Sequence, residues 1–282
     1  MTRWGWCGAL SIVGLLACDQ SALAQEASPE PSDPQTNYAF AAQLGSGIYS
    51  SSAGTVQVYR FAGGFSLRSL VSDGWGLRLR IPLTIGFYNF KQSDVLASGL
   101  PEKLSTLALV PELRLEFPAA ENWRLMPFAA AGVGRDFSAD RANYILAGGA
   151  RSLATFKWRS IDLSLGNRLF YTGHVTSGLE FGDDFGALES GVDARRSLGF
   201  SVWGHEMDAG LFLMNYLYFV SPELVRFYGA QISVDVQWEF GATFGTTTPW
   251  KVLGLTLPKV GISYRAGGDA SVFRIVFGET FH

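Results

Sequence analysis

The stretch AQISVDVQWEFGATF, residues 230–244, determines which fold we expect. Its even-numbered residues are all apolar, from Ala230 to Phe244, and the residues between them are polar, charged or glycine. Successive side chains of a β-strand point to opposite faces, so the stretch predicts one strand with an apolar and a polar face. Its 15 residues exceed the roughly 5–6 of an ordinary strand. A tilted strand that crosses a lipid bilayer needs about 9–11 residues, so the stretch favours a membrane strand.

The same alternation recurs along the chain. Every odd-numbered residue in 75–87 is apolar, and residues 107–117 and 273–277 follow the pattern. Weaker versions begin near Tyr38, Val56, Trp123, Tyr144, Ile161, Leu188, Met207 and Val260. We therefore expect an all-β fold, a single closed antiparallel transmembrane β-barrel of about 12 strands, since single-chain bacterial outer-membrane barrels have an even number.

The composition supports a membrane location without helices. Hydrophobic residues make up 48% of the chain and charged residues only 17%. After residue 24, no stretch has the roughly 18 uninterrupted apolar residues of a membrane helix. Lipid accepts only helices and closed sheets, so a closed barrel is the fold that fits. The net charge of -3 gives no reason to expect a nucleic acid as partner.

Residues 1–24 are typical of a secretory signal peptide. Arg3 is the only charge before the apolar run 7–18, and Ala22-Leu23-Ala24 has the small-x-small pattern of a cleavage site. The apolar run is too short to cross a bilayer. We expect cleavage before Gln25 and export of the mature chain to the outer membrane.

A lipoprotein cleavage site is the alternative, with Cys18 as the acylated residue. Both cysteines, Cys7 and Cys18, lie inside the predicted signal peptide, so the mature chain is expected to have neither disulfides nor cysteine metal sites. Residues 25–36 hold three prolines and three acidic residues, which predicts a disordered periplasmic tether. The barrel is then expected over residues 37–282.

The connections between the predicted strands divide into two sets. At one end we expect short turns, at 72–74, 118–122, 157–160, 201–205 and 245–252. At the other end we expect loops at 50–54, 91–103, 136–142, 172–185, 219–229 and 266–270. Outer-membrane barrels have short periplasmic turns and longer external loops, so the first set is assigned to the periplasm.

Tryptophans support this assignment. Five of the six that follow the predicted signal peptide lie at or beside the predicted short turns, namely Trp75, Trp123, Trp158, Trp203 and Trp250. Aromatic residues form girdles at membrane interfaces, so this set predicts the periplasmic girdle.

The polar face of the predicted strands carries charges of both signs. We expect these side chains to line the barrel interior and to neutralise one another. A path for ions or solutes is the alternative, and no ring of a single sign assigns a selectivity. The principal lining residues are predicted to be Arg78, Arg80, Glu112, Arg114, Asp162, Arg168, Glu189, Asp193, Asp235 and Glu239.

Evidence for catalysis is weak in this sequence. His174 and Ser177 are the candidate residues, and outer-membrane lipid hydrolases use a histidine and a serine on one strand, typically two positions apart. Here the spacing is three, which sends two strand side chains to opposite faces. The pattern contains no zinc motif, phosphate-binding glycine loop or dinucleotide fingerprint, so neither a metal nor a cofactor is expected.

The closing stretch LPKVGISYRAGGDASVFRIVFGETF, residues 257–281, resembles the last hairpin of autotransporter β-domains. The chain as a whole is similar to solitary autotransporter-like barrels that lack a passenger. The resemblance implies that Phe277 and Phe281 form the assembly signal read by the barrel-assembly machinery. We expect outer-membrane lipids and lipopolysaccharide as further partners, and a structural or interaction role or a narrow pore. A lipid hydrolase with a site near His174 is the alternative.

Overall fold

The computed structural model consists of β-strands and their connections. It describes residues 45–51, 54–70, 74–88, 106–137, 141–176, 181–220, 224–227, 230–232, 236–248, 251–252, 255–256, 259–268, 270–277 and 280–281. None of these residues forms a helix long and apolar enough to cross a membrane. The predicted signal peptide and tether lie outside the described residues.

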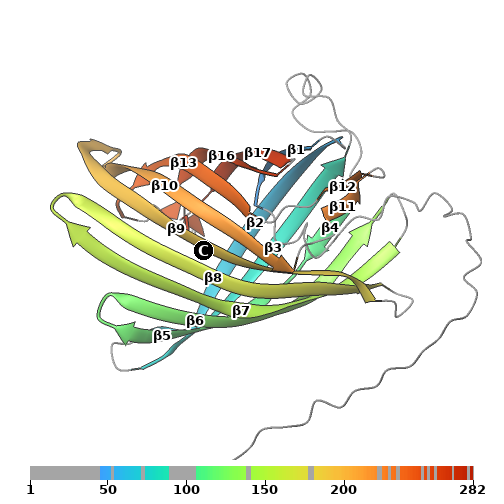
Figure 1. Cartoon of the computed structure of the whole chain (residues 1–282). Coiled ribbons are helices and arrows are strands. Elements are labelled where there is room, and N and C mark those ends of the chain that lie inside the picture. The colour runs from blue at the N-terminus through green and yellow to red at the C-terminus, as the bar shows by residue number, and fades with distance from the viewer. Residues whose placement is uncertain are drawn as a thin grey trace, which may run out of the picture. The chain divides into compact units, whose positions relative to one another are not determined.

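The main sheet contains 13 strands among the described residues. Its order is β2-β1-β17-β16-β13-β10-β9-β8-β7-β6-β4-β3-β5, and a further pairing of β2 with β3 closes it into a barrel (Figure 1). The strands are β1 (Gly47–Ser51), β2 (Gly54–Arg68), β3 (Gly76–Tyr88), β4 (Thr106–Leu109), β5 (Glu112–Ala120), β6 (Trp123–Asp136), β7 (Arg141–Trp158), β8 (Ile161–Thr176), β9 (Phe181–Val202), β10 (His205–Val220), β13 (Val236–Thr246), β16 (Val260–Gly267) and β17 (Ala270–Phe277).

Strands β4 and β5 occupy a single position in the barrel wall. Both pair with β3 on one side and β6 on the other. Pro111 lies between them and faces the region of Pro82 on β3, and neither proline has a backbone N–H to give to the sheet. The amide of Val110 still donates to the carbonyl of Pro82 at 3.3 Å. Thirteen described strands therefore fill twelve positions, which confirms the predicted fold.

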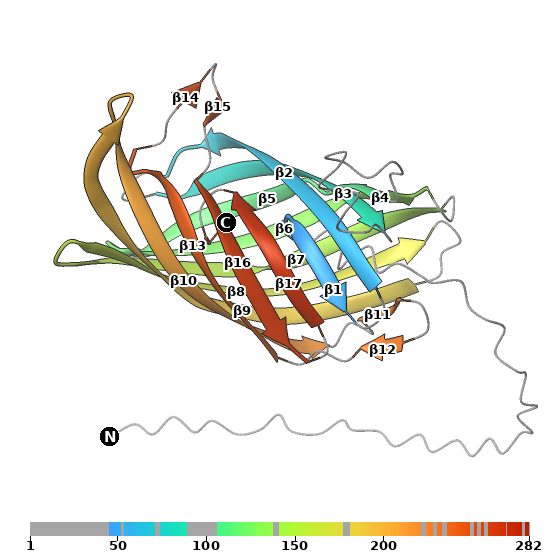
Figure 2. The ribbon, with the colours of Figure 1, turned by 90° about the horizontal axis from the view of Figure 1, so that it is seen from above.

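The barrel closes where its first strand, β1, pairs with its last strand, β17. This strand pairs with β17 through Gly47 and Arg274, and with β2 through Gly47 and Val58. Figure 2 shows β1 between β17 and β2. All pairings are antiparallel, so neighbouring strands join through turns at alternating ends.

Burial in this barrel is the inverse of that in a water-soluble protein. On β5, Glu112, Arg114 and Glu116 are buried, whereas Leu113 is 46% exposed and Phe117 is 40% exposed. Other large apolar side chains on the outer surface include Leu146, Leu169, Leu211, Phe240, Ile262 and Ile275. An apolar outer band with a polar interior is the pattern of a barrel that faces lipid.

Two-residue connections occur at both ends of the barrel, since β1–β2 and β16–β17 are joined by two residues each at the end where longer loops were expected. At the short-turn end, β5–β6, β7–β8 and β9–β10 are joined by two residues each. Trp203 and Gly204 in the last of these turns both have positive φ, 49° and 78°. Two-residue hairpin turns of type I′ require positive φ at both positions, and their twist matches that of the flanking strands. Trp75, Trp123, Trp158 and Trp203 are exposed at this end, and Trp250 lies outside the described residues.

Two predicted connections have different lengths in the structure. The loop predicted at 172–185 is shorter, because β8 extends to Thr176 and β9 begins at Phe181, and their ladder continues to the pair Val175 and Phe181. The turn predicted at 245–252 is longer. Between β13 and β16 it contains a small separate sheet of β14 (Lys251–Val252) and β15 (Leu255–Thr256).

The described residues of the stretch 230–244 belong to two sheets. Residues Ala230–Ile232 form β12, which pairs with β11 (Leu224–Phe227) in a separate two-stranded sheet. From Val236 onward the stretch belongs to β13 of the barrel wall, as predicted, and it pairs there with β10 and β16. Asp235 lies outside the described residues.

Candidate functional site

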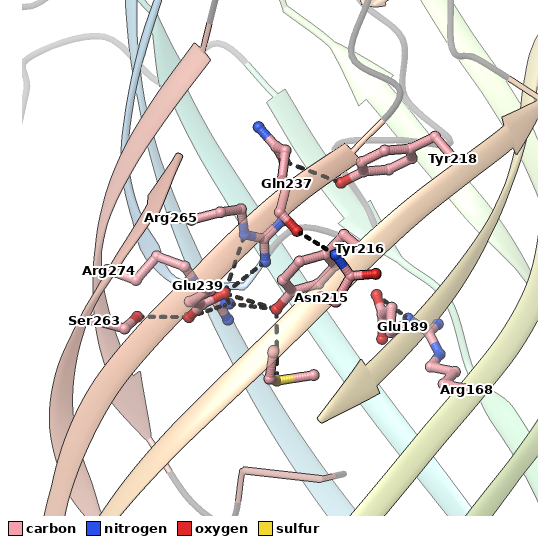
Figure 3. Close-up of polar contacts among 11 residues, drawn as sticks. Arg168, Glu189, Asn215, Tyr216, Tyr218, Gln237, Glu239, Ser263, Arg265 and Arg274 are labelled. Carbon is pink, nitrogen blue, oxygen red and sulfur yellow. Dashed lines mark hydrogen bonds and ion pairs between the residues drawn. The ribbon is translucent and has the colours of Figure 1, made fainter. Parts of the chain in front are cut away.

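The clearest constellation inside the barrel surrounds the carboxylate of Glu239 on β13, which is only 1% exposed. We call this group the Glu239 cluster (Figure 3). Its other members come from the neighbouring strands β10, β16 and β17, namely Tyr216, Ser263, Arg265 and Arg274.

The two oxygens of Glu239 accept bonds from every member of this cluster. Arg265 Nη2 lies 3.0 Å from Oε2, and Arg274 Nη1 lies 2.7 Å from Oε2 and 2.9 Å from Oε1. Tyr216 Oη donates to Oε2 at 2.6 Å and Ser263 Oγ donates to Oε1 at 2.6 Å. Bonds to an ionised group are stronger than neutral ones, so this carboxylate is fully compensated for its burial.

Strand register explains why these side chains meet. Glu239 is directly opposite Arg265 in the β13–β16 ladder, and Ser263 is directly opposite Arg274 in the β16–β17 ladder. Side chains directly opposite each other share one face of a sheet. Three adjacent strands thus deliver one acid and two bases to the same patch of the interior.

A second constellation, the Glu112 cluster, comprises Glu112, Arg114, Arg151, Arg168 and Glu189. Arg114 Nη2 lies 2.6 Å from Glu112 Oε1, and Arg151 Nη2 lies 3.1 Å from Glu112 Oε2. Arg168 Nη1 lies 3.3 Å from Glu189 Oε1. Arg60 and Arg80 interact electrostatically with members of this cluster, so it contains more positive than negative groups among the described residues.

A third constellation, the Asp208 cluster, comprises Asp193, Arg195, Asp208, Thr243 and Lys259. Arg195 Nη1 lies 2.6 Å from Asp208 Oδ1, and Lys259 Nζ lies 3.4 Å from Asp208 Oδ2. Arg195 Nη2 also donates to Thr243 Oγ1 at 2.8 Å. Acids and bases are balanced here, which is the pattern of a structural network.

Residues 280 and 281 lie against the inside of the wall. Thr280 Oγ1 donates to Asp193 Oδ2 at 2.5 Å, and Phe281 packs against a cluster of buried aromatic and apolar side chains. Gly166 on β8 and Gly191 on β9 are directly opposite each other. A Cβ at Gly166 would lie 2.3 Å from the Phe281 ring, and one at Gly191 would lie 3.2 Å from it. The two glycines therefore provide the space for this ring.

Phe277 and Phe281 have the same parity in the sequence, which predicts a lipid-facing side for both; for Phe281 that prediction is wrong. Phe277 is exposed on the outer face of β17, as predicted, whereas Phe281 lies inside. Strand β17 ends at Phe277, and alternation no longer determines side-chain direction beyond the end of a strand. The role of either residue as an assembly signal stays a prediction.

Most of the predicted lining residues do come together. Glu112, Arg114, Arg168 and Glu189 meet in one cluster, while Asp193 and Glu239 belong to the others. Arg78 pairs with Glu116 at 3.2 Å near the short-turn end and is 46% exposed. Asp162 forms an ion pair with Lys157 at 3.7 Å, and its side chain is 60% exposed because it lies one residue into β8. It is at the rim and outside the clusters.

The catalytic candidates are not brought together by the described part of the chain. His174 is paired with Ile145 in the β7–β8 ladder, its side chain is not among those described, and Ser177 lies outside the described residues. No group of three or more metal-ligating side chains occurs within the described part of the chain. Sequence reasoning missed Tyr216, Lys259 and Thr280, although Tyr216 has the inward parity of its strand.

These features define a class: a closed antiparallel β-barrel of outer-membrane type, apolar outside and lined with ion pairs inside. Neither a protein-family model nor a curated protein matches the chain. Among solved structures it is similar to LpxR from Salmonella typhimurium, with 12% sequence identity and a TM-score of 0.41 over 80% of this chain and 88% of that chain. The resemblance to autotransporter-like barrels stays a prediction.

Proposed function

We propose that this chain is an integral outer-membrane barrel with a structural or interaction role, and that its interior is closed by its own side chains. One observation carries the proposal: the wall is apolar on its outside, while its inside is lined with buried ion pairs and Phe281 packs against it. A water-filled channel leaves its lining solvated, whereas Glu239, Asp208 and Glu112 are buried.

The experiment is conductance of the refolded protein in a planar lipid bilayer. We expect no steady open level for the wild type. Heat-modifiable migration on a gel establishes beforehand that the barrel is assembled. A stable, voltage-independent open level in correctly assembled protein would contradict the closed interior and would favour a narrow pore.

Membrane residence is tested separately from conductance. Fractionation should place the mature chain with outer membranes, and extraction should require detergent. A mature chain that stays soluble without detergent would refute the membrane assignment, whatever its conductance.

The alternative of a lipid hydrolase with a site near His174 is tested on the same preparation of assembled barrel. Lipids incubated with the assembled barrel are separated by thin-layer chromatography, with His174→Ala as the control. We expect no product. If the wild type releases fatty acid and His174→Ala does not, the proposed structural role is wrong and the protein is an enzyme.

A further inference from the structure

We propose that the Glu112 cluster is a binding site for an oxyanion of the phosphate type. This inference concerns the barrel interior alone and does not rest on whether the barrel conducts.

Two arginines of the cluster are placed directly opposite each other on neighbouring strands. Arg151 on β7 and Arg168 on β8 are cross-strand partners, and both point inward. Their guanidinium carbons lie 5.0 Å and 5.4 Å from the centre of the same ring, that of Phe128. Like charges directly opposite each other destabilise a sheet, and the cost rises in a poorly solvated interior. Glu112 and Glu189 each offset one of these two charges, and a bound anion would offset them further.

Arg151 has donors available for such an anion. The residue is 7% exposed, and its Nη2 contacts Glu112. Its Nε and Nη1 are buried and have no hydrogen-bond partner within the described structure. Buried guanidinium donors without a partner are costly, and a missing ligand or ion is one explanation for them.

The surroundings of Arg151 favour a negative ligand. Arg80, Arg114 and Arg168 all interact electrostatically with Arg151, and Glu112 is the one acid among its principal electrostatic partners. The planar guanidinium group matches the oxygens of phosphate and carboxylate groups, often with two parallel hydrogen bonds. Phosphate has enough acceptor oxygens to satisfy donors that arrive from several strands, so it is the ligand class that we assign.

Arginines continue from the short-turn end of the barrel toward the cluster. Arg78, close to the start of β3, has a 46% exposed side chain and pairs with Glu116. Arg80 follows two residues further into the barrel and is partly exposed. Arginines that begin at the mouth and continue inward would attract anions toward Arg151.

The test uses the full refolded protein in a neutral detergent, with inorganic phosphate as the probe. Thermal unfolding is followed by heat-modifiable migration at increasing phosphate, with chloride at equal ionic strength as the reference. We expect a saturable rise in the unfolding temperature with phosphate only. Arg151→Gln should weaken the apparent affinity by about tenfold or more, because it removes charge-assisted hydrogen bonds.

Arg159→Gln is the control. Arg159 lies in the exposed β7–β8 turn, so this substitution removes the same charge outside the site. It should keep the wild-type response. If Arg151→Gln does not assemble, Arg80→Gln replaces it with the same expected weakening. Equal phosphate responses in the wild type and the site variant, or no saturable response in the wild type, would overturn the proposal.

A second arm separates the sources of the phosphate group. Phosphatidylglycerol in the same micelles replaces inorganic phosphate as the probe. A response to the lipid that depends on Arg151 would assign the site to a lipid headgroup, and a response to inorganic phosphate would assign it to a solute. A lipid response that Arg151→Gln leaves intact would belong to the outer surface and would count against the site.

Discussion

The Glu239 and Glu112 clusters lie in the same barrel and use the same residue types, yet they satisfy their charges differently. Glu239 receives two arginines and two hydroxyl groups on its two oxygens. Glu112 receives Arg114 and Arg151, and Arg151 keeps two buried donors without a partner. A carboxylate that is fully bonded indicates a structural role. Arg151, by contrast, keeps two donors that the described residues around it do not use.

The largest effect is expected at the structural cluster. Glu239→Ala would leave Arg265 and Arg274 buried against each other, and removal of one partner from a buried pair costs about 3–5 kcal/mol. We expect loss of assembled barrel, or a large fall in the temperature at which the heat-modified band appears. Glu239→Gln keeps the shape and some hydrogen bonds, so it should be milder. An Ala variant as stable as the wild type would end the structural interpretation.

The next effect compares the two faces of one strand. Phe240 follows Glu239 on β13 and is 61% exposed on the outer face. Phe240→Arg should cost about 2–4 kcal/mol if this position faces the middle of the bilayer. The matched change Phe240→Leu should be close to neutral. Urea unfolding in lipid vesicles measures both, and an arginine tolerated there would mean that the face does not contact lipid.

A smaller effect is expected from the glycines that hold Phe281. Gly166→Val would place a side chain where the Phe281 ring lies, and Phe281→Ala would remove the ring. We expect each to destabilise the barrel by about 1–3 kcal/mol, less than for a fully buried phenylalanine because this ring is partly exposed. Planar-bilayer recordings should show brief openings that the wild type lacks. Phe277→Ala, on the outer face, is the control and should not change conductance.

The role of Phe281 in assembly can be separated from its packing. If the assembly machinery reads the outward aromatic side chain, Phe277→Asp should lower the amount of assembled barrel in cells more than Phe281→Asp does. Export to the periplasm should be unaffected in both. The reverse order, measured by quantitative fractionation, would return the signal to Phe281.

The smallest effect sharpens the comparison of the two clusters. Glu112→Gln removes one negative charge from the arginine-rich side and should lower stability by about 1–3 kcal/mol in phosphate-free buffer. Added phosphate should recover much of this loss, because the anion takes over part of the role of the carboxylate. Glu239→Gln should not recover under the same conditions. Equal behaviour of the two variants would remove the distinction between the clusters.

The barrel could be predicted from the sequence because alternation with period two is a local property. Residues 75–87 and 107–117 show their outer and inner faces without any knowledge of their partners. The break at Pro111 and the pairing of residues 230–232 with β11 in a separate sheet depend on the neighbouring strands. Local alternation carries no information on which partner a strand will have, so the sequence alone does not predict either feature.

The clusters were only partly predictable for a related reason. Inward parity placed Glu112, Arg168 and Glu239 in the interior, but it did not say which charges would meet. Glu239 and Arg274 are 35 positions apart, and their contact follows from two successive strand registers. The glycine pair that accommodates Phe281 likewise becomes visible only when β8 and β9 are aligned. Asp162 has the inward parity of its strand, but it lies so near the strand end that its side chain is at the rim and outside the clusters.

The position of Thr280 and Phe281 also affects how the barrel unfolds. In a closed wall each strand contacts mainly its two neighbours, so local opening can spread one strand at a time, as it does between the units of repeat proteins. Strand β17 is separated from β9 by β16, β13 and β10 in the sheet order, yet the residues that follow it contact Gly191 and Asp193 on β9. We therefore expect the opening of the β1–β17 seam to be coupled to the loss of packing on β9.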